Sequence, residues 1–183
     1  MDREQALLEL KKNIKNKNLL KHMYACEAVM QGLAEHFGED RDKWGLAGLL
    51  HDIDYDSTAE DLKRHSLVGA EMLQKMGISE DIVYAVKVHN STHGLPRNSL
   101  MDKALYATDP VTGLIVAGAL IRPEKKIDAI DVPFLVNRFN EKSFAKGANR
   151  AQIACCSEMG LSLEEFLELS LKAMQGIKGV LGL

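Results

Sequence analysis

The sequence predicts an all-α protein with about eight to ten helices, because apolar residues recur at three- and four-residue steps along most of the chain. This is the period of a helix that buries one face. Only 4 of the 183 residues are Pro and 14 are Gly, so few positions interrupt a helix. No pair of alternating segments flanks a tight turn as a β-hairpin requires. We therefore expect one compact helical bundle over residues 1–183.

Capping residues and glycines mark the ends of the expected helices. Gly38 follows an amphipathic stretch and is predicted to end it. Ser99 is a predicted N-cap, and Ser162 is predicted to form a capping box with Glu165. The expected helices cover residues 7–14, 19–37, 42–50, 67–76, 100–121, 134–139, 148–159 and 163–177, with one more after Ser79.

Two places in this pattern are ambiguous. The acidic segment Asp52–Thr58 is typical of a loop, and Thr58-Ala59-Glu60-Asp61 resembles the capping sequence of a further helix. Pro110 lies inside the expected helix 100–121, where its missing N–H predicts a kink or a boundary.

Composition excludes several classes of protein. The chain has 23 basic and 26 acidic residues, and this net charge of −3 argues against a dedicated nucleic-acid binder. Its longest apolar run, residues 111–121, is about half the ~20 residues of a membrane span, so we expect no membrane partner. The N-terminus is polar and does not resemble a signal peptide. Three cysteines without a C-x-x-C pair make no disulfide framework, which favours a cytoplasmic location.

Histidine and aspartate form the most informative pattern in the chain. His51-Asp52 directly follows an apolar run built from Leu, Ala and Gly, so its burial is costly unless each side chain finds a strong partner. A divalent metal is such a partner. Imidazole nitrogen together with carboxylate oxygen suits Fe, Mn, Co, Ni or Zn better than Ca.

The spacing His22 … His51-Asp52 … Asp109 resembles that of the HD superfamily of metal-dependent phosphohydrolases. Three flanking stretches carry the same resemblance: Leu46-Ala47-Gly48-Leu49-Leu50-His51-Asp52-Ile53, His65-Ser66-Leu67-Val68-Gly69-Ala70-Glu71 and Val86-Lys87-Val88-His89-Asn90. The resemblance extends over residues 18–122 and is nearest to the two-metal branch, in particular bacterial HD dinucleoside tetraphosphatases. It implies an HD-domain helical bundle, against which the helices of residues 123–183 pack.

The resemblance also implies the ligands of two metal ions. His22, His51, Asp52 and Asp109 would bind the first, and His65 and His89 would bind the second. Asp52 would bridge both ions and is the catalytic residue of this assignment. Two such cations can share a hydroxide and clamp a phosphate through its oxygens.

Departures from the family pattern bear on the chemistry. Many relatives have His-Asp-Ile-Gly-Lys at the doublet, whereas this chain has His51-Asp52-Ile53-Asp54-Tyr55-Asp56. The missing Lys weakens the assignment as a di-iron HD oxygenase. The absence of a Gly-Tyr-Pro signature disfavours cyclic dinucleotides as substrates. Asp54 or Asp56 would orient a water or protonate a leaving group, unless both belong to an exposed acidic loop.

A phosphate substrate also needs contacts from the protein. Lys146 and Arg150 lie four residues apart in the densest basic segment and are expected to bind phosphate, unless the segment is a solvated basic face. His93, four residues after His89, is a candidate substrate contact.

The leading hypothesis is a phosphohydrolase that acts on a small phosphorylated, nucleotide-like molecule through a metal-bound hydroxide. No Gly-x-Ser-x-Gly elbow offers a protein nucleophile, and Cys155 and Cys156 lie in an apolar helical context where thiols tend to be inert. A di-iron oxygenase on the same scaffold and a non-catalytic metal- or ligand-binding module are the alternatives. The sequence leaves a homodimer open.

Overall fold

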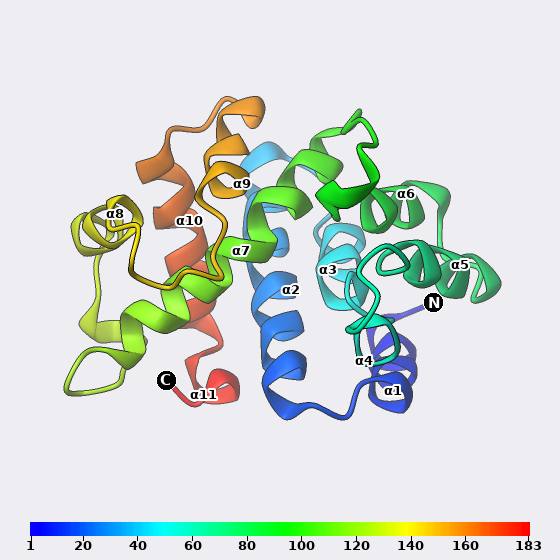
Figure 1. The fold of residues 1–183 in the computed structure, drawn as a ribbon, viewed down its shortest axis with the longest axis horizontal. Coiled ribbons are helices and arrows are strands. Elements are labelled where there is room, and N and C mark those ends of the chain that lie inside the picture. Colours follow the sequence, from blue (N-terminus) through cyan, green and yellow to red (C-terminus); the bar gives the residue numbers. More distant parts are fainter.

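The computed structural model describes all of residues 1–183 and contains helices and no strands, which confirms the predicted all-α class (Figure 1). The longer helices are α1 (Arg3–Asn13), α2 (Lys17–Phe37), α3 (Arg41–Leu50), α5 (Leu67–Lys75), α6 (Glu80–Val88), α7 (Leu100–Leu120), α8 (Val132–Asn140), α9 (Arg150–Ala154) and α10 (Leu163–Gly176). Single helical turns are α4 (Tyr55–Thr58) and α11 (Lys178–Leu181), and the 3-10 helices are η1 (Ser91–His93), η2 (Ile127–Ala129) and η3 (Cys155–Met159).

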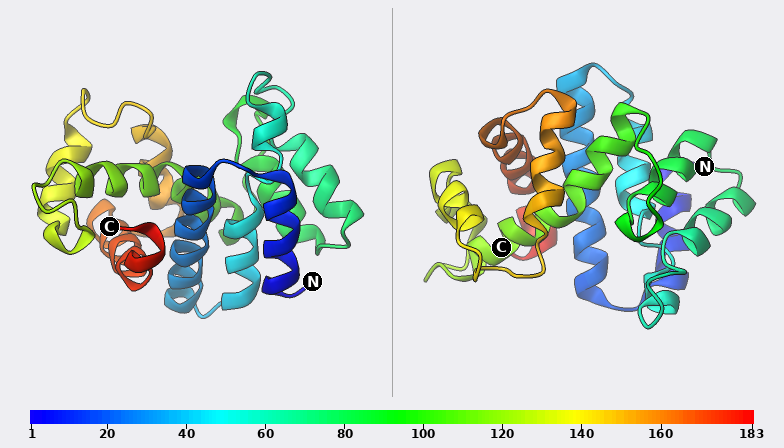
Figure 2. Two further views of the ribbon diagram at one scale, coloured as in Figure 1. Left: turned by 90° about the horizontal axis from the view of Figure 1, so that it is seen from below. Right: turned by 45° about the horizontal axis from the view of Figure 1, so that its top comes forward.

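The two longest helices, α2 and α7, form the centre of the molecule. Helix α7 crosses α2, with α1 and α3–α6 on one side of α2 and α8–α11 on the other (Figures 1 and 2). Met23, Met30 and Leu33 of α2 are fully buried, as are Leu105 and Leu114 of α7. Burying such side chains stabilises the fold by roughly 1.5–3 kcal/mol each. None of the helices combines the length and the apolar character needed to cross a membrane.

A glycine contact sets the close approach of α3 to α2. A Cβ atom on Gly48 would lie 2.6 Å from the carbonyl oxygen of Cys26, so no larger residue fits at this crossing. One turn away from this contact, α3 ends and His51 follows, while His22 lies one turn before Cys26 on α2. The crossing therefore brings these two histidines together.

The proline inside α7 does not end the helix. Pro110 has no N–H to donate to the carbonyl of Tyr106, four residues earlier. The side-chain Nε2 of Gln152, which belongs to α9, donates to that carbonyl at 2.8 Å. A contact from another helix thus supplies the hydrogen bond that the proline removes, and the predicted boundary at Pro110 is absent.

Two of the predicted helix caps are present in the structure, and the one predicted at Thr58 is not. Ser99 and Ser162 cap α7 and α10 as expected, each with a reciprocal capping box. Thr58 does not cap a new helix: it ends the single turn α4, and its hydroxyl donates to the carbonyl of Asp54 at 2.9 Å. The acidic segment is therefore partly helical, and the expected helix 148–159 is divided into α9 and η3.

Candidate metal centre

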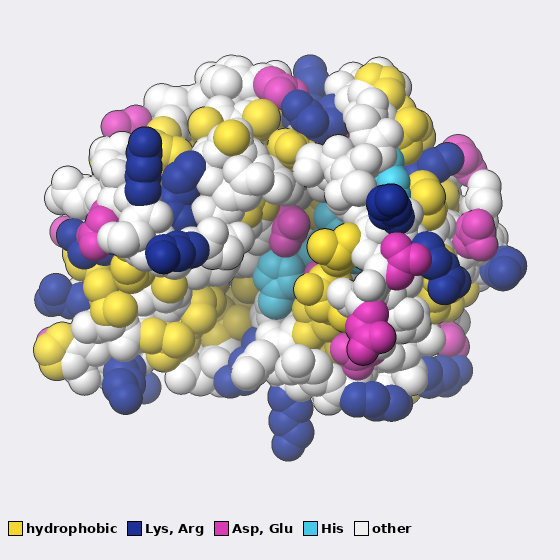
Figure 3. Space-filling view, in the orientation of Figure 1, with side chains coloured by type: hydrophobic (Ala, Val, Ile, Leu, Met, Phe, Trp, Pro, Cys, Tyr) yellow, Lys and Arg dark blue, Asp and Glu magenta, His cyan; other side chains and the backbone are white.

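Five segments of the chain meet where α2, α3 and α7 come together. His22 lies on α2 and His51-Asp52 follows the end of α3. His65 precedes α5, His89 follows α6, and Asp109 lies in the middle of α7. Figure 3 shows histidine and acidic atoms exposed side by side at the bottom of a hollow in this face. The structure thus brings together all six residues that the sequence suggested as ligands.

The first group of donors surrounds His22. Its Nε2 atom lies 3.2 Å from Nε2 of His51 and 3.2 Å from Oδ1 of Asp109. The same nitrogen is 3.9 Å from Oδ2 of Asp52. Nε2 of His51 is 3.6 Å from Oδ1 of Asp52. These are the four side chains assigned to the first metal.

The second group shares the carboxylate of Asp52. Its Oδ1 atom lies 3.2 Å from Nε2 of His65 and 3.3 Å from Nε2 of His89. The two imidazole rings meet edge to face, with their centroids 5.2 Å apart. Asp52 therefore lies between the two groups, with Oδ1 facing His65 and His89 and Oδ2 nearest to His22.

The outer nitrogen of every histidine in the cluster has an acceptor. Nδ1 of His51 donates to the carbonyl of Gly48 at 2.9 Å, and Nδ1 of His89 donates to the carbonyl of Val86 at 2.6 Å. Nδ1 of His65 donates to Asp54 at 3.0 Å, and Nδ1 of His22 donates to the Thr112 hydroxyl at 2.9 Å. Such partners fix the tautomer and turn the Nε2 lone pair toward a metal.

Asp54 is a buried member of this surrounding layer and not part of an exposed loop. One carboxylate oxygen accepts from His65, and the other accepts from the backbone N–H groups of Ser66 and Gly69, both at 2.9 Å. Asp56 differs, because it is exposed and accepts from the backbone N–H of Lys15 at 2.7 Å. The sequence offered the same two roles for both residues, and only the tertiary structure separates them.

The charges of the cluster are strongly coupled. Burial opposes the ionisation of Asp52, but His51, His65 and His89 hold its pKa well below the ordinary value. Burial lowers the pKa of His51 to about 4. Burial also opposes the charge on His65, yet its hydrogen bonds to Asp52 and Asp54 raise its pKa to about 10. The carboxylate is thus ionised, as metal binding requires, while His65 must release a proton to bind a cation.

The donor set fits a divalent transition metal. Ligands at about 2.1 Å from one ion lie about 3 Å apart when they are at right angles. The separations of 3.2 Å from His22 Nε2 to Asp109 Oδ1 and from His65 Nε2 to Asp52 Oδ1 are close to this value. Mixed imidazole and carboxylate donors favour ions such as Fe, Mn, Co, Ni or Zn.

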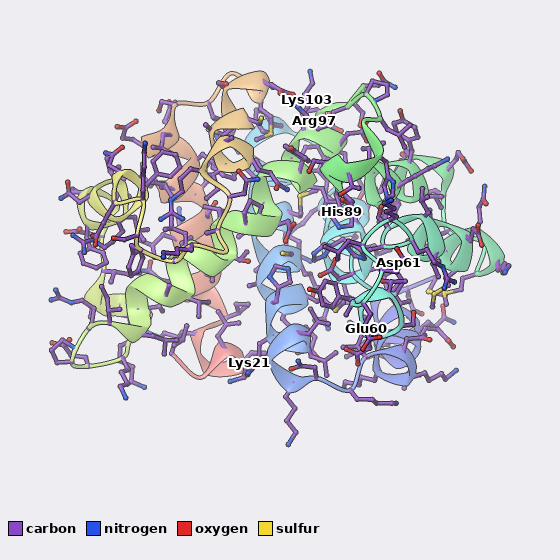
Figure 4. All side chains as sticks on the ribbon, in the orientation of Figure 1. Lys21, Glu60, Asp61, His89, Arg97 and Lys103 are labelled. Carbon is purple, nitrogen blue, oxygen red and sulfur yellow. The ribbon has the colours of Figure 1, made fainter.

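The cluster opens into a cleft of about 670 Å³. No Lys or Arg side chain lines it, and its other polar residues are mostly neutral, among them Asn16, Asn18, Asn90, Ser91 and Gln152. Figure 4 shows the cations Lys21, Arg97 and Lys103 well away from His89. Arg97 is also engaged, because it pairs with Glu158 at 2.6 Å. A phosphate in this cleft would depend on metal ions for its neutralisation.

The structure does not place Lys146 and Arg150 in the cleft. Lys146 lines a separate surface depression beside residues 147–150. The Arg150 guanidinium donates to six backbone carbonyls, those of Arg138, Phe139, Glu141, Phe144, Ala145 and Ala148. The four-residue spacing that suggested a phosphate site assumed a continuous helix, whereas residues 141–149 form turns that fold around Arg150.

His93 lies behind the cluster and does not line the cleft. Its Nε2 atom donates to the backbone carbonyl of His65 at 2.8 Å. It belongs to η1, so it is not on a helix face shared with His89. In this position His93 supports the backbone of a ligand residue.

Cys26 is a neighbour of the cluster that the sequence analysis did not identify. Its Sγ atom is buried 3.7 Å from Nε2 of His22, and the donor atoms of Cys26, His22 and His51 all lie within 4.8 Å of one another. The available signal was its position one helical turn after His22. Thr112 was missed as well, and the corresponding signal was its position one helical turn after Asp109.

The chain matches a family model and several known proteins. A family model described as "HD domain" matches residues 19–130. Ribonuclease Y of Lawsonia intracellularis is 34% identical over 83 residues, 45% of this chain and 16% of that protein. Ribonuclease Y of Desulfotalea psychrophila is 27% identical over 136 residues, 73% of this chain and 26% of that protein.

A relative of similar size is also found. The symmetrical bis(5'-nucleosyl)-tetraphosphatase of Bacillus subtilis is 28% identical over 130 residues, 60% of this chain and 68% of that protein. The chain spans only about a quarter or less of the two ribonuclease Y proteins. No solved structure matches the chain significantly.

Proposed function

The chain belongs to the HD domain family, and on that premise we propose that it is a metal-dependent phosphohydrolase acting on a small, nucleotide-like phosphate ester or anhydride. The observation that carries the proposal is the orientation of the four histidines. Each Nδ1 has an acceptor, and each Nε2 lies within 3.6 Å of a carboxylate oxygen of Asp52 or Asp109, below the open cleft that His22, His65 and His89 line. A purely structural polar core would not need to turn four Nε2 atoms toward two shared carboxylates beside an open cleft.

Two cations are the proposed cofactors. His22, His51, Asp52 and Asp109 would hold the first, and His65, His89 and Asp52 the second. Bound there, they would supply Lewis acidity toward phosphate oxygens and lower the pKa of water near the phosphorus. The cleft itself offers neutral amides and hydroxyls, such as Asn90 and Ser91, for orienting the substrate.

Water is the proposed nucleophile, because no protein side chain is suited to this role. Burial raises the pKa of the Cys26, Cys155 and Cys156 thiols, so none is a ready thiolate. In the proposed reaction, the water oxygen forms a bond to phosphorus while the bond to the leaving oxygen breaks. The protons of water are shared between the released phosphate and the leaving group.

A nucleotide-like substrate is supported by the tetraphosphatase relative, whose name states a dinucleoside polyphosphate as its substrate. The ribonuclease Y relatives favour a second candidate, the cleavage of RNA. RNA binding usually relies on Lys and Arg contacts to several phosphates. No such side chain lines the cleft and the chain is acidic overall, so we give preference to the small substrate.

A substrate screen with defined metals tests the proposal. The purified protein would be loaded separately with Mn, Fe, Co, Ni or Zn and its metal content measured. It would then be offered dinucleoside polyphosphates, nucleotides, sugar phosphates and a short RNA. We expect release of phosphate or nucleotide from a nucleotide-like compound, with loss of turnover in chelator and in Asp52→Asn.

The matched control is Asp42→Asn, which changes an exposed carboxylate on α3. It should retain both metal content and turnover. Turnover that survives complete metal removal would contradict the mechanism. Preferential cleavage of RNA would instead establish the second candidate.

A further inference from the structure

A second hollow continues from the metal cleft along α2 and α7. Its volume is about 430 Å³, and it shares Asn18 and His22 with the cleft. Figure 3 shows it as the recess beside the exposed histidine, with hydrophobic atoms along its far side. Because the two hollows meet at His22, a molecule with its phosphate at the cluster can extend into the second one.

The helical repeat explains this continuity. Gly113, Val116 and Leu120 follow Asp109 at intervals of three or four residues, so they lie on the same face of α7 as the metal-site aspartate. Ala25 has the same relation to His22 on α2. All four of these residues line the second hollow, which we call the α2–α7 groove.

The wall of the groove is mainly apolar and carries little charge. Leu181 and Leu183 line it together with Ala25 and Val116, and no Asp or Glu side chain lines it. Its one Lys or Arg side chain is Lys21, whose Nζ atom donates to the carbonyl of Leu181 at 2.7 Å. The Lys21 ammonium group is therefore already hydrogen-bonded to the backbone of the groove wall.

We propose that the α2–α7 groove is a specificity subsite that binds an uncharged, mainly apolar organic group of the substrate, while the phosphate lies at the metal cluster. This proposal rests on the function proposed above, because it places the phosphate at His22 and Asp109. It favours a nucleobase or an alkyl group over a sugar or a second phosphate. Moving such a group from water into contact with the apolar side chains of the groove would be favourable.

Gly113 provides a way to block the groove. A Cβ atom built on Gly113 has no neighbour within 4 Å, so a side chain there occupies groove space without displacing packed atoms. Gly176 near the end of α10 is equally open and does not line the groove. Gly113→Leu and Gly176→Leu are therefore a matched pair, since both add the same side chain to a helix.

Phosphonate binding is the test, because it does not depend on turnover. Calorimetry would give the affinity of metal-loaded protein for methyl-, butyl- and hexylphosphonate, and for AMP against ribose 5-phosphate. Burial of one methylene corresponds to roughly a fourfold gain in affinity. We expect butylphosphonate to bind at least about tenfold more tightly than methylphosphonate, since its three extra methylenes would be partly buried. A preference for AMP over ribose 5-phosphate would identify the base as the natural occupant, and a preference confined to the alkyl series would identify an alkyl group.

The two variants make the result specific to the groove. In Gly113→Leu the affinity ratio of hexyl- to methylphosphonate should fall close to one, and in Gly176→Leu it should stay at the unmodified value. Equal affinities along the series, no phosphonate binding at all, or the same ratio in both variants would overturn the subsite. Phosphonates that bind with the expected ratio, in a protein that hydrolyses none of the screened phosphates, would leave the subsite standing and refute the proposed hydrolase.

Discussion

Asp54 is a buried carboxylate that can orient His65, one of the proposed metal ligands. It accepts from Nδ1 of His65 and from two backbone N–H groups at the start of α5. An amide in its place would turn an N–H group toward one of these donors. The orientation of His65 toward Asp52 depends on this arrangement.

We therefore predict that Asp54→Asn weakens binding of the second metal about 10–100-fold, the usual effect of losing such an outer partner. Metal titration followed by calorimetry would measure it. Asp56→Asn is the matched control, because Asp56 lies at the exposed edge of the cleft, accepts a hydrogen bond from the backbone N–H of Lys15 and makes none to a histidine of the cluster. Equal metal affinity in Asp54→Asn and the unmodified protein would refute the orienting role.

At the scale of helices, the approach of α3 to α2 depends on Gly48. We predict that Gly48→Ala destabilises the protein by about 1–3 kcal/mol, because the new methyl group would overlap the Cys26 carbonyl and force the helices apart. The same displacement should weaken metal binding, since it separates His22 from His51. Urea unfolding and metal titration measure the two effects.

Gly45→Ala is the control for this change. The nearest atoms to its Cβ would belong to the flexible side chain of Gln31 and not to backbone, and this side chain can move away. Alanine also favours a helix over glycine by up to about 1 kcal/mol. Gly45→Ala should therefore be neutral or stabilising, and similar losses in both variants would show that the close contact at Gly48 is not the cause.

The hydrogen bond between α9 and α7 gives a second prediction at this scale. Gln152→Met removes the donor to the Tyr106 carbonyl and should cost about 1–3 kcal/mol. Introducing Pro110→Ala restores a backbone N–H in α7, so Gln152→Met should cost less in that background. A double-mutant cycle by urea unfolding measures the coupling. Equal costs in both backgrounds would show that Gln152 does not compensate for the proline.

Local signals in the sequence predicted the helices well, but they could not predict hydrogen bonds between residues far apart in the chain. The caps Ser99 and Ser162 act within four residues, so the pattern identified them. The continuation of α7 through Pro110 depends on Gln152, 42 residues later in the chain. The contacts of Arg150 were the hardest to foresee, because its six carbonyl partners exist only after residues 138–148 have folded around it.

At the scale of the whole molecule, the candidate site joins segments from His22 to Asp109. The family pattern identified six side chains that the fold brings together, because their order along the chain is specific even though their spacing is long. The residues that contact these six side chains were harder to predict from the sequence. Asp54, Thr112 and Cys26 are each near a ligand residue in the sequence, but only packing decides which of them touches it.

This shared site should make the stability of the metal-free protein depend on pH more steeply than that of the metal-loaded protein. Without metal, His65 has a pKa of about 10, above its ordinary value of 6.5. A raised pKa stabilises the folded state fully below pH 6.5, and this contribution is lost as the pH rises through 10. His51, whose pKa is lowered to about 4, is neutral in the folded state across this window, and its unfolded form loses its proton near pH 6.5, so it adds slope only at the lower end. The melting temperature in chelator should therefore fall between pH 6.5 and pH 9.

Metal removes this loss of stability, because it replaces the proton on His65. Its affinity rises as this proton is lost, so the stabilisation by a fixed metal concentration should grow over the same range. Thermal melts in chelator and in excess Mn or Zn would measure both trends. His65→Asn should reduce the slope of the metal-free protein to the part that His22 contributes, because burial opposes the charge on His22 but Cys26 and Asp109 hold its pKa well above its usual value. His36→Asn, which changes an exposed residue near the end of α2, should leave the slope unchanged. Parallel slopes with and without metal would mean that protons and metal do not compete at this cluster, and the ligand assignment of His65 would then fail.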